Sequence, residues 1–338
     1  MKITNITSYF SKDKGAYLVK LDTDEGVSGF GECSPMNNKG VCQIIEDNIK
    51  PVMVGMDPLN VVKIEDSVMK KNYKFSGQLL AMAFSGLEIA LWDLKGKYLN
   101  QPVYNLLGGK YWDTIEYYGS SMSRDLSPED EANKVKKAIV EFGFKAVKIK
   151  VGARMGSASG IVDYDGDIEK IKVVRETIGP KVKLLVDGNS SFTYFQAEQL
   201  FNKIKEYDIF VFEEPCPYYD VESYVKLAER LSVPINIREQ DWNLYVIKEF
   251  IARGACHISA VDVTKCGGFI NAKRVADLCR AFGILYAPHN TTRGVGFYAT
   301  AHLVASTPEC AFYQEYSIQG LGDREKYILS RLTPENGM

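Results

Sequence analysis

The chain has 338 residues, of which 46% are hydrophobic and 25% charged, and its formal net charge is -2. This composition is typical of a globular protein, and without a basic surplus or Lys/Arg runs it argues against nucleic acid as a partner. No apolar stretch approaches membrane-spanning length and the N-terminus lacks the build of a signal peptide, so no membrane partner is expected.

The cysteines and the chain length set two further expectations. The 7 cysteines are scattered without any C-x-x-C pair, and their number is odd. This pattern predicts reduced thiols and a cytoplasmic location. The length is enough for one parallel α/β barrel of typical size plus about a hundred further residues, so we expect two domains.

The first part of the chain, residues 1–112, has strand patterns followed by helical patterns. Residues 16–21 and 26–32 flank a polar turn and predict an antiparallel hairpin. Residues 79–97 carry apolar side chains spaced mostly by three or four, which predicts an amphipathic helix. Strands followed by helices are typical of an α+β domain.

From residue 113 onward, strand and helix patterns alternate. Helical patterns such as 129–142 and 168–178 lie between the strands, and the Gly-, Ser- and Asp-rich segment 152–166 predicts an extended loop. The candidate strands are residues 115–119, 146–151, 184–187, 210–213, 234–238, 260–263, 284–287 and 311–314. This alternation predicts an α/β fold with a closed parallel barrel over residues 113–315.

Two lysines, Lys148 and Lys150, stand two residues apart on the second candidate strand, so their side chains point to the same face. If that face is the barrel interior, mutual repulsion lowers the pKa of at least one of them, as a lysine base requires. The alternative is that both face solvent, where lysines are most often found.

Three carboxylates follow three successive candidate strands. Asp187 ends the third strand, Glu213 the fourth and Glu239 the fifth. The carboxyl ends of barrel strands meet at one rim, where three acids repel one another unless a cation neutralises them. Ligation by oxygen alone favours a hard ion, most plausibly Mg2+. Each acid alone would more often be a helix cap or a surface ion-pair partner. Their arrival at successive strand ends favours a metal site.

Asp262, His289 and Glu315 belong to the sixth, seventh and eighth candidate strands. A carboxylate at one imidazole nitrogen fixes the tautomer and raises basicity, so Asp262 and His289 predict an acid-base pair. We expect Glu315 to lie at the same rim, with a solvated loop position as its alternative. The other two histidines, His257 and His302, have no rim position and are expected to be structural.

These motifs together resemble the enolase superfamily and, within it, the mandelate racemase subgroup. The resemblance covers nearly the whole chain, with the further motifs D-E-G-V-S-G-F-G-E (24–32) and A-L-W-D-L-K-G-K (90–97) in the first part. The matching barrel motifs are K-I-K (148–150), D-G-N (187–189), E-E-P (213–215), R-E-Q (238–240), D-V-T-K-C-G-G (262–268), P-H-N (288–290) and Q-E (314–315).

The resemblance implies a modified TIM barrel, (β/α)7β, with an α+β capping domain, to which residues 316–338 would return. The three acids at 187, 213 and 239 would bind Mg2+. Lys150 would be the base on one face of the substrate, with Lys148 tuning it or touching the substrate carboxylate. His289 with Asp262 would act on the opposite face, and Glu315 would help to bind the carboxylate. The connection at residues 11–16 is short, unlike the long lid of many relatives and like some sugar-acid dehydratases.

Such a site abstracts the proton next to a carboxylate through an enediolate. The polar segments 37–39, 120–124 and 290–293 favour a polyhydroxylated small-molecule carboxylate. We expect a lyase that dehydrates a sugar acid to a 2-keto-3-deoxy acid. A racemase or epimerase of a 2-hydroxy acid is the alternative, since the motifs do not separate the two outcomes. A Schiff-base aldolase and a non-catalytic barrel are less favoured, and a homo-oligomer is expected.

Overall fold

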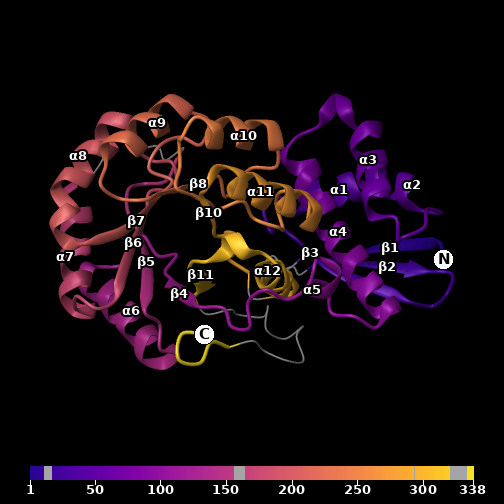
Figure 1. Cartoon of the computed structure of the whole chain (residues 1–338), viewed down its shortest axis with the longest axis horizontal. Coiled ribbons are helices and arrows are strands. Elements are labelled where there is room, and N and C mark those ends of the chain that lie inside the picture. Colours follow the sequence, from indigo (N-terminus) through magenta and orange to yellow (C-terminus); the bar gives the residue numbers. More distant parts are fainter. Residues whose placement is uncertain (11–16, 156–163, 293, 320–332) are drawn as a thin grey trace.

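The computed structural model describes residues 1–10, 17–155, 164–292, 294–319 and 333–338. An antiparallel sheet with its helices lies on one side of the molecule, and a parallel sheet ringed by helices lies on the other (Figure 1). We call the first group the cap and the second the barrel. The expected α/β fold, a modified barrel with an α+β cap, is confirmed.

The cap sheet consists of β1 (Ile3–Phe10), β2 (Tyr17–Thr23) and β3 (Ser28–Cys33), paired in that order and antiparallel. The predicted hairpin is therefore confirmed where the structure describes it. The cap helices are α1 (Asn38–Ile44), α2 (Lys50–Met53), α3 (Val61–Lys71), α4 (Gln78–Leu99) and α5 (Val103–Leu106), with a π-helical turn at Ile45–Ile49 and a 3-10 turn at Tyr73–Phe75.

Helix α4, predicted as residues 79–97, lies directly against β3. A Cβ at Gly31 of β3 would lie 1.9 Å from the carbonyl oxygen of Gly86 on α4, and a Cβ at Gly86 would lie 2.3 Å from Cys33 Sγ. Only glycine allows the two backbones to approach this closely. The side chains of β3 and α4 that face the barrel are therefore held in fixed positions.

The barrel sheet is parallel and its strand order is β10-β9-β8-β7-β6-β5-β4-β11. Its strands are β4 (Tyr117–Ser120), β5 (Ala146–Lys150), β6 (Lys183–Asp187), β7 (Ile209–Glu213), β8 (Ile235–Ile237), β9 (Ile258–Ser259), β10 (Leu285–Tyr286) and β11 (Gln314–Ser317).

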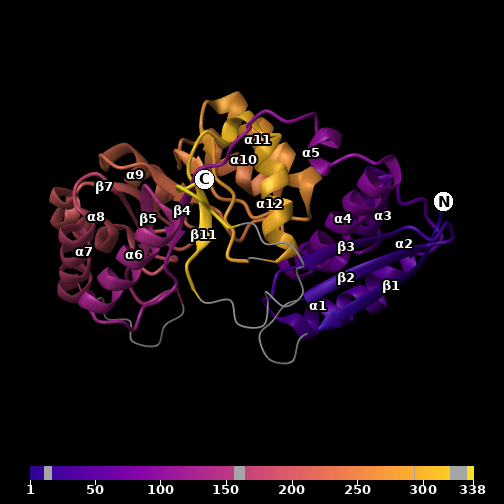
Figure 2. The ribbon, with the colours of Figure 1, turned by 90° about the horizontal axis from the view of Figure 1, so that it is seen from below.

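One helix follows each of the first seven barrel strands and packs outside the sheet (Figure 2). These helices are α6 (Pro128–Phe142), α7 (Tyr164–Ile178), α8 (Tyr194–Ile204), α9 (Val221–Arg230), α10 (Leu244–Ala252), α11 (Phe269–Phe282) and α12 (Val295–Ala305), with 3-10 turns at Lys205–Tyr207 and Pro308–Cys310. The predicted helices 129–142 and 168–178 correspond to α6 and α7.

Two of the predicted strands are displaced. Residues 260–263 were expected to form the sixth barrel strand, but β9 ends at Ser259 and these residues form the loop that follows it. Residues 311–314 were expected to form the eighth, but β11 begins at Gln314. Glu315 therefore lies within the last strand and not at its end.

The barrel ladder has one seam, between β10 and β11. Among the described residues no backbone ladder joins these two end strands, so the expected closed ladder is interrupted there. The backbone N–H of Asn290 crosses the seam and donates to Glu315 Oε2 at 2.9 Å. A side chain of the site thus replaces part of the missing ladder.

The last described residues, 333–338, lie against the barrel. The Tyr117 N–H donates to the Gly337 carbonyl at 2.8 Å, and the Gly337 N–H donates to the Phe142 carbonyl at 2.7 Å. These residues contact β4 and the end of α6, and most of the segment 316–338, which was expected to return to the cap, lies outside the described residues. The predicted short connection at 11–16 and much of the predicted loop 152–166 lie outside the described residues.

An apolar layer fills the barrel interior. It includes Tyr118 of β4, Ala146 of β5, Leu185 of β6 and Val211 of β7, all buried and in mutual contact. Because strand side chains alternate, the residue two positions further along each strand points to the same interior, one layer closer to the carboxyl ends. Those residues are polar: Ser120, Lys148, Asp187 and Glu213. The apolar layer thus forms the floor of a polar site.

Candidate active site

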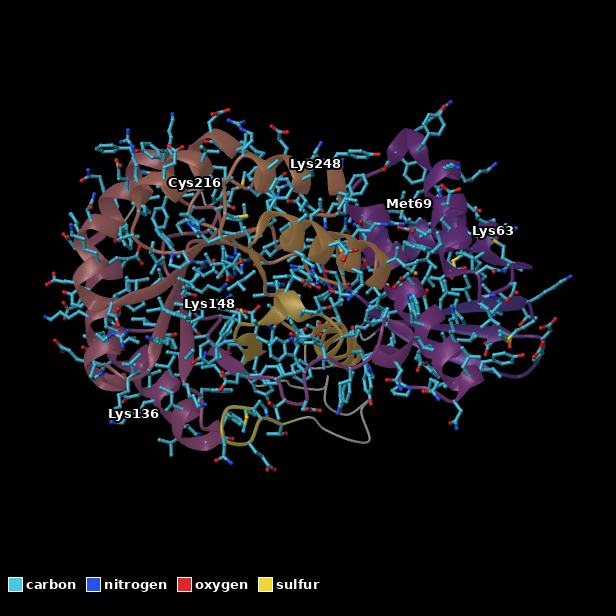
Figure 3. All side chains as sticks on the ribbon, viewed as in Figure 1. Lys63, Met69, Lys136, Lys148, Cys216 and Lys248 are labelled. Atoms are coloured by element: carbon cyan, nitrogen blue, oxygen red, sulfur yellow. The ribbon has the colours of Figure 1, made fainter. Side chains whose placement is uncertain are left out.

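The eight candidate site residues lie in this polar layer and in the loops that follow the strands. They are Lys148, Lys150, Asp187, Glu213, Glu239, Asp262, His289 and Glu315. Each of them is buried, with at most 6% of its surface exposed. Figure 3 shows Lys148 within the barrel, in contrast to Lys136 and Lys248 on its outer helices. The alternative positions in solvent, which are the common ones for lysines and acids, therefore do not apply to these residues.

Asp187, Glu213 and Glu239 offer a group of carboxylate oxygens that all lie within 4.8 Å of one another. The Asn189 N–H donates to Asp187 Oδ1 at 2.8 Å, and Asn236 Nδ2 donates to Glu213 Oε2 at 2.8 Å. These bonds orient the carboxylates before any ion arrives. The set consists of oxygen atoms only, is anionic and is buried, so its chemistry fits a hard divalent cation.

The two lysines of β5 reach into this group of acids. Lys148 Nζ bonds Glu213 Oε1 and lies 3.0 Å from Glu315 Oε1, and Lys150 Nζ bonds Asp187 Oδ2. Burial lowers the pKa of Lys148, but the carboxylates of Glu213 and Glu315 outweigh burial and hold it well above its usual value. Lys148 is therefore not the lysine of lowered pKa that the sequence predicted for at least one of the pair.

His289 and Asp262 form the expected pair on the other side of the acids. His289 Nδ1 lies 2.8 Å from Asp262 Oδ2, and His289 Nε2 lies 3.2 Å from Glu239 Oε2. Asp262 Oδ1 in turn accepts the Thr264 N–H at 2.7 Å and the Thr264 hydroxyl at 2.8 Å. The aspartate is fixed at one oxygen and orients the imidazole with the other, leaving Nε2 directed towards the acids.

Glu315 lies between the lysine side and the histidine side. Its Oε1 accepts the Ser120 hydroxyl at 2.6 Å, and its Oε2 lies 3.9 Å from His289 Nε2. Burial raises the pKa of Glu315, but Lys148, His289 and Lys150 outweigh burial and lower it to about 2. The carboxylate is therefore ionised and firmly placed.

Several residues that support the site were not singled out as site residues from the sequence. Ser120, expected only as part of the polar segment 120–124, and Asn236 each bind an acid of the site. Both are polar side chains within buried strands, which is the signal that identifies them. Lys265 Nζ lies 3.3 Å from His289 Nδ1 and 3.7 Å from Asp262 Oδ2. Lys265 lies in the D-V-T-K-C-G-G motif, and its place in that motif is the sequence signal that could have identified it.

Glu214, the second acid of the E-E-P motif, supports the backbone at Glu239. Its Oε1 accepts the N–H groups of Arg238 and Glu239, each at 3.2 Å. Burial raises the pKa of Glu214 to about 8, and the carboxylates of Glu239 and Asp187 raise it in the same direction. Glu214 therefore holds the turn that presents Glu239.

The other two histidines bind backbone groups. His257 Nδ1 accepts the Ile235 N–H at 3.1 Å, and His302 Nδ1 accepts the Tyr104 N–H at 3.4 Å. Both are structural contacts, in agreement with the expectation from the sequence.

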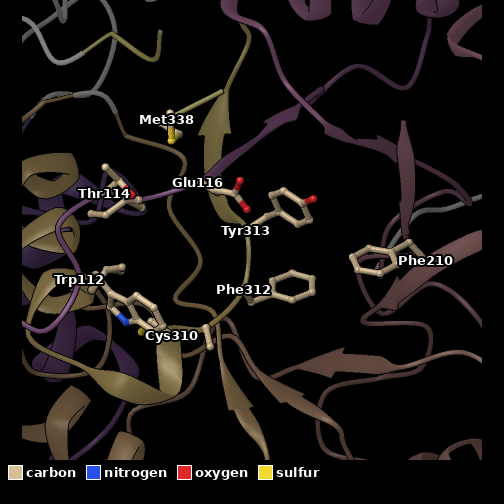
Figure 4. A pocket seen from close by; sticks show the side chains of 11 residues that line it. Trp112, Thr114, Glu116, Phe210, Cys310, Phe312, Tyr313 and Met338 are labelled. Carbon is tan, nitrogen blue, oxygen red and sulfur yellow. The ribbon is translucent and has the colours of Figure 1, made fainter. Parts of the chain in front are cut away.

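A cavity of about 470 Å³ lies at the opposite end of the barrel from the acids (Figure 4). It is lined by residues that precede or begin strands, such as Glu116, Phe210 and Tyr313. Phe210 stacks on Phe312 with ring centroids 5.6 Å apart. The cavity contains none of the polar site residues, so its size alone does not mark it as the active site.

No helix among the described residues has the length and apolar character needed to cross a membrane.

Both parts of the chain match known protein families. Residues 6–108 match the N-terminal domain of mandelate racemase/muconate lactonizing enzyme, and residues 130–338 match the enolase C-terminal domain-like family. An arabinonate dehydratase from Saccharolobus solfataricus is 29% identical over 85% of this chain and 75% of its own length. A D-xylonate dehydratase from Haloferax volcanii is 30% identical over 89% of this chain and 75% of its own length.

A solved structure has the same fold over almost the whole chain. It is a mandelate racemase/muconate lactonizing protein from Paracoccus denitrificans in complex with magnesium, with a TM-score of 0.92 and 27% identity. The match covers 99% of this chain and 91% of that one. The protein therefore belongs to the mandelate racemase/muconate lactonizing enzyme family of the enolase superfamily.

Proposed function

We propose that the protein is a Mg2+-dependent sugar-acid dehydratase, a lyase that converts a sugar acid to a 2-keto-3-deoxy acid. The observation that carries the proposal is the placement of Lys150 and His289 on two sides of one buried group of carboxylates. The arabinonate and D-xylonate dehydratases to which the chain is similar support this choice of reaction.

Asp187, Glu213 and Glu239 would hold the Mg2+ ion, which when bound stabilises negative charge on the substrate carboxylate by several kcal/mol, to order of magnitude. Lys150 takes the proton from the carbon next to that carboxylate, and the electron pair moves into the enediolate. Lys148 binds the carboxylate end of the substrate, and the ionised Glu315, 3.0 Å away, holds the Lys148 ammonium in place.

His289 completes the dehydration from the other side. Its Nε2 gives a proton to the hydroxyl on the next carbon, which leaves as water, and the resulting enol becomes the 2-keto-3-deoxy acid. Asp262, 2.8 Å from Nδ1, stabilises the charged imidazole before it gives up the proton.

Racemisation or epimerisation of a 2-hydroxy acid is the second candidate, since the same two-sided arrangement can return a proton to the opposite face. A Schiff-base aldolase is disfavoured because it would have no need for three clustered carboxylates. The choice between the first two depends on whether a hydroxyl leaves.

A screen of mono- and diacid sugars with Mg2+ is expected to give a 2-keto-3-deoxy product from at least one sugar acid. The ketone is measured as its semicarbazone, and omission of Mg2+ serves as the control. Conversion of a 2-hydroxy acid to its epimer without any ketone would select the second candidate instead. Absence of both reactions with every acid of the screen in the presence of Mg2+ would contradict both candidate functions.

Mg2+ is expected to raise the melting temperature by about 5 °C at a hundredfold excess over its Kd. A ligand that binds only the folded state contributes about 2.7 kcal/mol at that excess. Differential scanning fluorimetry with MgCl2, against NaCl of equal ionic strength, measures the shift, and EDTA should reverse it. An identical melting temperature in both salts would show that the three acids do not bind the ion.

A further inference from the structure

The barrel helices differ in how their first turns are capped. Helices α6, α8, α9 and α10 each begin after a residue whose own side chain accepts a backbone N–H of the first turn. These N-cap residues are Ser127, Thr193, Asp220 and Asn243. In contrast, α11 and α12 begin after Gly268 and Gly294, which have no side chain to offer.

A glutamate from the cap supplies the missing acceptor at α11. Glu88 of α4 accepts the Phe269 N–H at its Oε2, at 2.7 Å, and the Ile270 N–H at its Oε1, at 3.1 Å. The Trp92 indole N–H also donates to Oε1, at 2.7 Å, and fixes the carboxylate on its own helix. Glu88 is fully buried, so no water is at hand to accept hydrogen bonds from these first-turn N–H groups instead of the glutamate.

A second cap glutamate does the same at α12. Glu32 of β3 accepts the Gly296 N–H at its Oε2, at 2.8 Å, and is 2% exposed. Figures 1 and 2 both show α11 and α12 on the side of the barrel that faces α4 and β3. Of the six barrel helices whose N-cap residue the structure describes, the two that lack a side-chain cap of their own are thus the two that receive one from the cap domain.

The glycines at the two N-cap positions make room for these carboxylates. A Cβ at Gly268 would lie 2.1 Å from Glu88 Oε2, and a Cβ at Gly294 would lie 2.5 Å from Glu32 Oε2. A serine, threonine or aspartate of the usual kind would therefore exclude the cap glutamate. At these two helices the sequence replaces a local cap with a contact between domains.

The loops that enter these two helices carry the acid-base pair. Asp262 lies in the loop between β9 and α11, and His289 lies in the loop between β10 and α12. Helix α4 makes further contacts with the first loop, since the Gly267 N–H donates to Ser85 Oγ at 2.7 Å. The lysines and the three proposed metal ligands, in contrast, come from β5 to β8 and the residues just after them.

We propose that Glu32 and Glu88 are positioning residues for the Asp262–His289 pair, acting through the two helix termini that they cap. The inference rests on the proposed function for the role of His289. Docking of the cap then does more than cover the substrate, because it sets the distance of the pair from the proposed metal ligands. Among the described residues, the ion pairs of the two lysines are made with barrel residues.

The first test measures amide exchange in the Mg2+-loaded full chain without substrate. Glu88→Gln keeps the side-chain volume, but both oxygens of Glu88 accept N–H groups, so an amide NH2 must face a donor. Hydrogen-deuterium exchange of the Phe269 and Ile270 amides is expected to become about tenfold faster. The Asp130 amide, which is capped by Ser127 Oγ at 3.1 Å, should exchange as before. Unchanged exchange at Phe269 and Ile270 would overturn the capping role whatever the reaction is.

The second test compares two rates in the same enzyme. With substrate in D2O, Glu88→Gln and Glu32→Ala should lower formation of the keto product about tenfold more than they lower exchange of the α-proton. Ser127→Ala removes the cap of α6, whose loop carries none of the acid-base residues, and should leave the ratio of the two rates unchanged. An equal fall in both rates for the glutamate variants would show a merely structural role and refute the inference. A wild type without keto product would instead refute the proposed function, and the amide exchange would still decide the capping.

Discussion

Replacing Glu213 with glutamine is expected to abolish Mg2+ binding and to lower dehydration by on the order of 10³-fold. Glu213 contributes one of three carboxylates whose oxygens lie within 4.8 Å of one another. Its Oε1 faces Lys148 Nζ and its Oε2 faces Asn236 Nδ2, and both neighbours are hydrogen-bond donors. The glutamine amide would have to turn its own NH2 towards one of them, so the variant loses a bond as well as a charge. Calorimetric titration with MgCl2 and assay of the keto product measure the two effects.

The matched control is Glu116→Gln, which removes the same charge at the opposite end of the barrel. Glu116 pairs there with Lys145 at 2.8 Å and lines the cavity of Figure 4. Its Mg2+ affinity and turnover should equal those of the wild type, because an exposed ion pair contributes little. Wild-type Mg2+ affinity in Glu213→Gln would contradict the assignment of Glu213 as a ligand.

The strands β5, β6 and β7 could be predicted from the sequence because each is a short run of mostly apolar residues that ends on a charged one. Each of these strands places one apolar residue on the barrel floor and one polar residue two positions later, as in Leu185 and Asp187. Burial of the floor forces the polar residue into the same interior. The convergence of Lys148, Asp187 and Glu213 therefore follows from local pattern alone.

The pattern was misleading after β9, where a polar turn resembles a strand. The run Val261-Asp262-Val263-Thr264 alternates apolar and polar residues, yet the Asp262 carbonyl accepts the N–H groups of Lys265 and Cys266, at 3.0 and 2.9 Å. The Asp262 side chain takes the Thr264 N–H as well. Aspartate competes in this way with strand pairing, and the two-residue alternation cannot reveal it.

The contacts between cap and barrel could not be predicted from the sequence pattern, for a different reason. Glu88 lies in a long buried helix and binds N–H groups 181 and 182 residues further along the chain. No local period relates the two positions, since they meet only after both domains have folded. A buried glutamate in an apolar helix signals that a partner exists, but it does not identify that partner.

Replacing His289 with asparagine is expected to separate proton abstraction from dehydration. The variant loses the group that protonates the leaving hydroxyl, so formation of the keto product should fall by about 10² to 10⁴-fold. Lys150 lies beside Asp187 on the other side of the site, so the proposed base is still present and can take the α-proton. NMR in D2O should therefore show deuterium at the α-carbon of recovered substrate while little product forms. His302→Asn, the same change at a histidine that binds the Tyr104 N–H, serves as the control and should keep product formation.

The reciprocal variant, Lys150→Met, decides which side abstracts the proton. If Lys150 is the base, this variant loses both exchange and product, because nothing on its face can take the α-proton. If His289 is the base, Lys150→Met retains exchange and His289→Asn loses it. An epimerase behaves differently from both, since each variant then exchanges the α-proton from its one remaining face and the wild type forms no ketone. Full turnover by His289→Asn would exclude all three assignments, because the imidazole 2.8 Å from Asp262 would then hold the loop and transfer no proton.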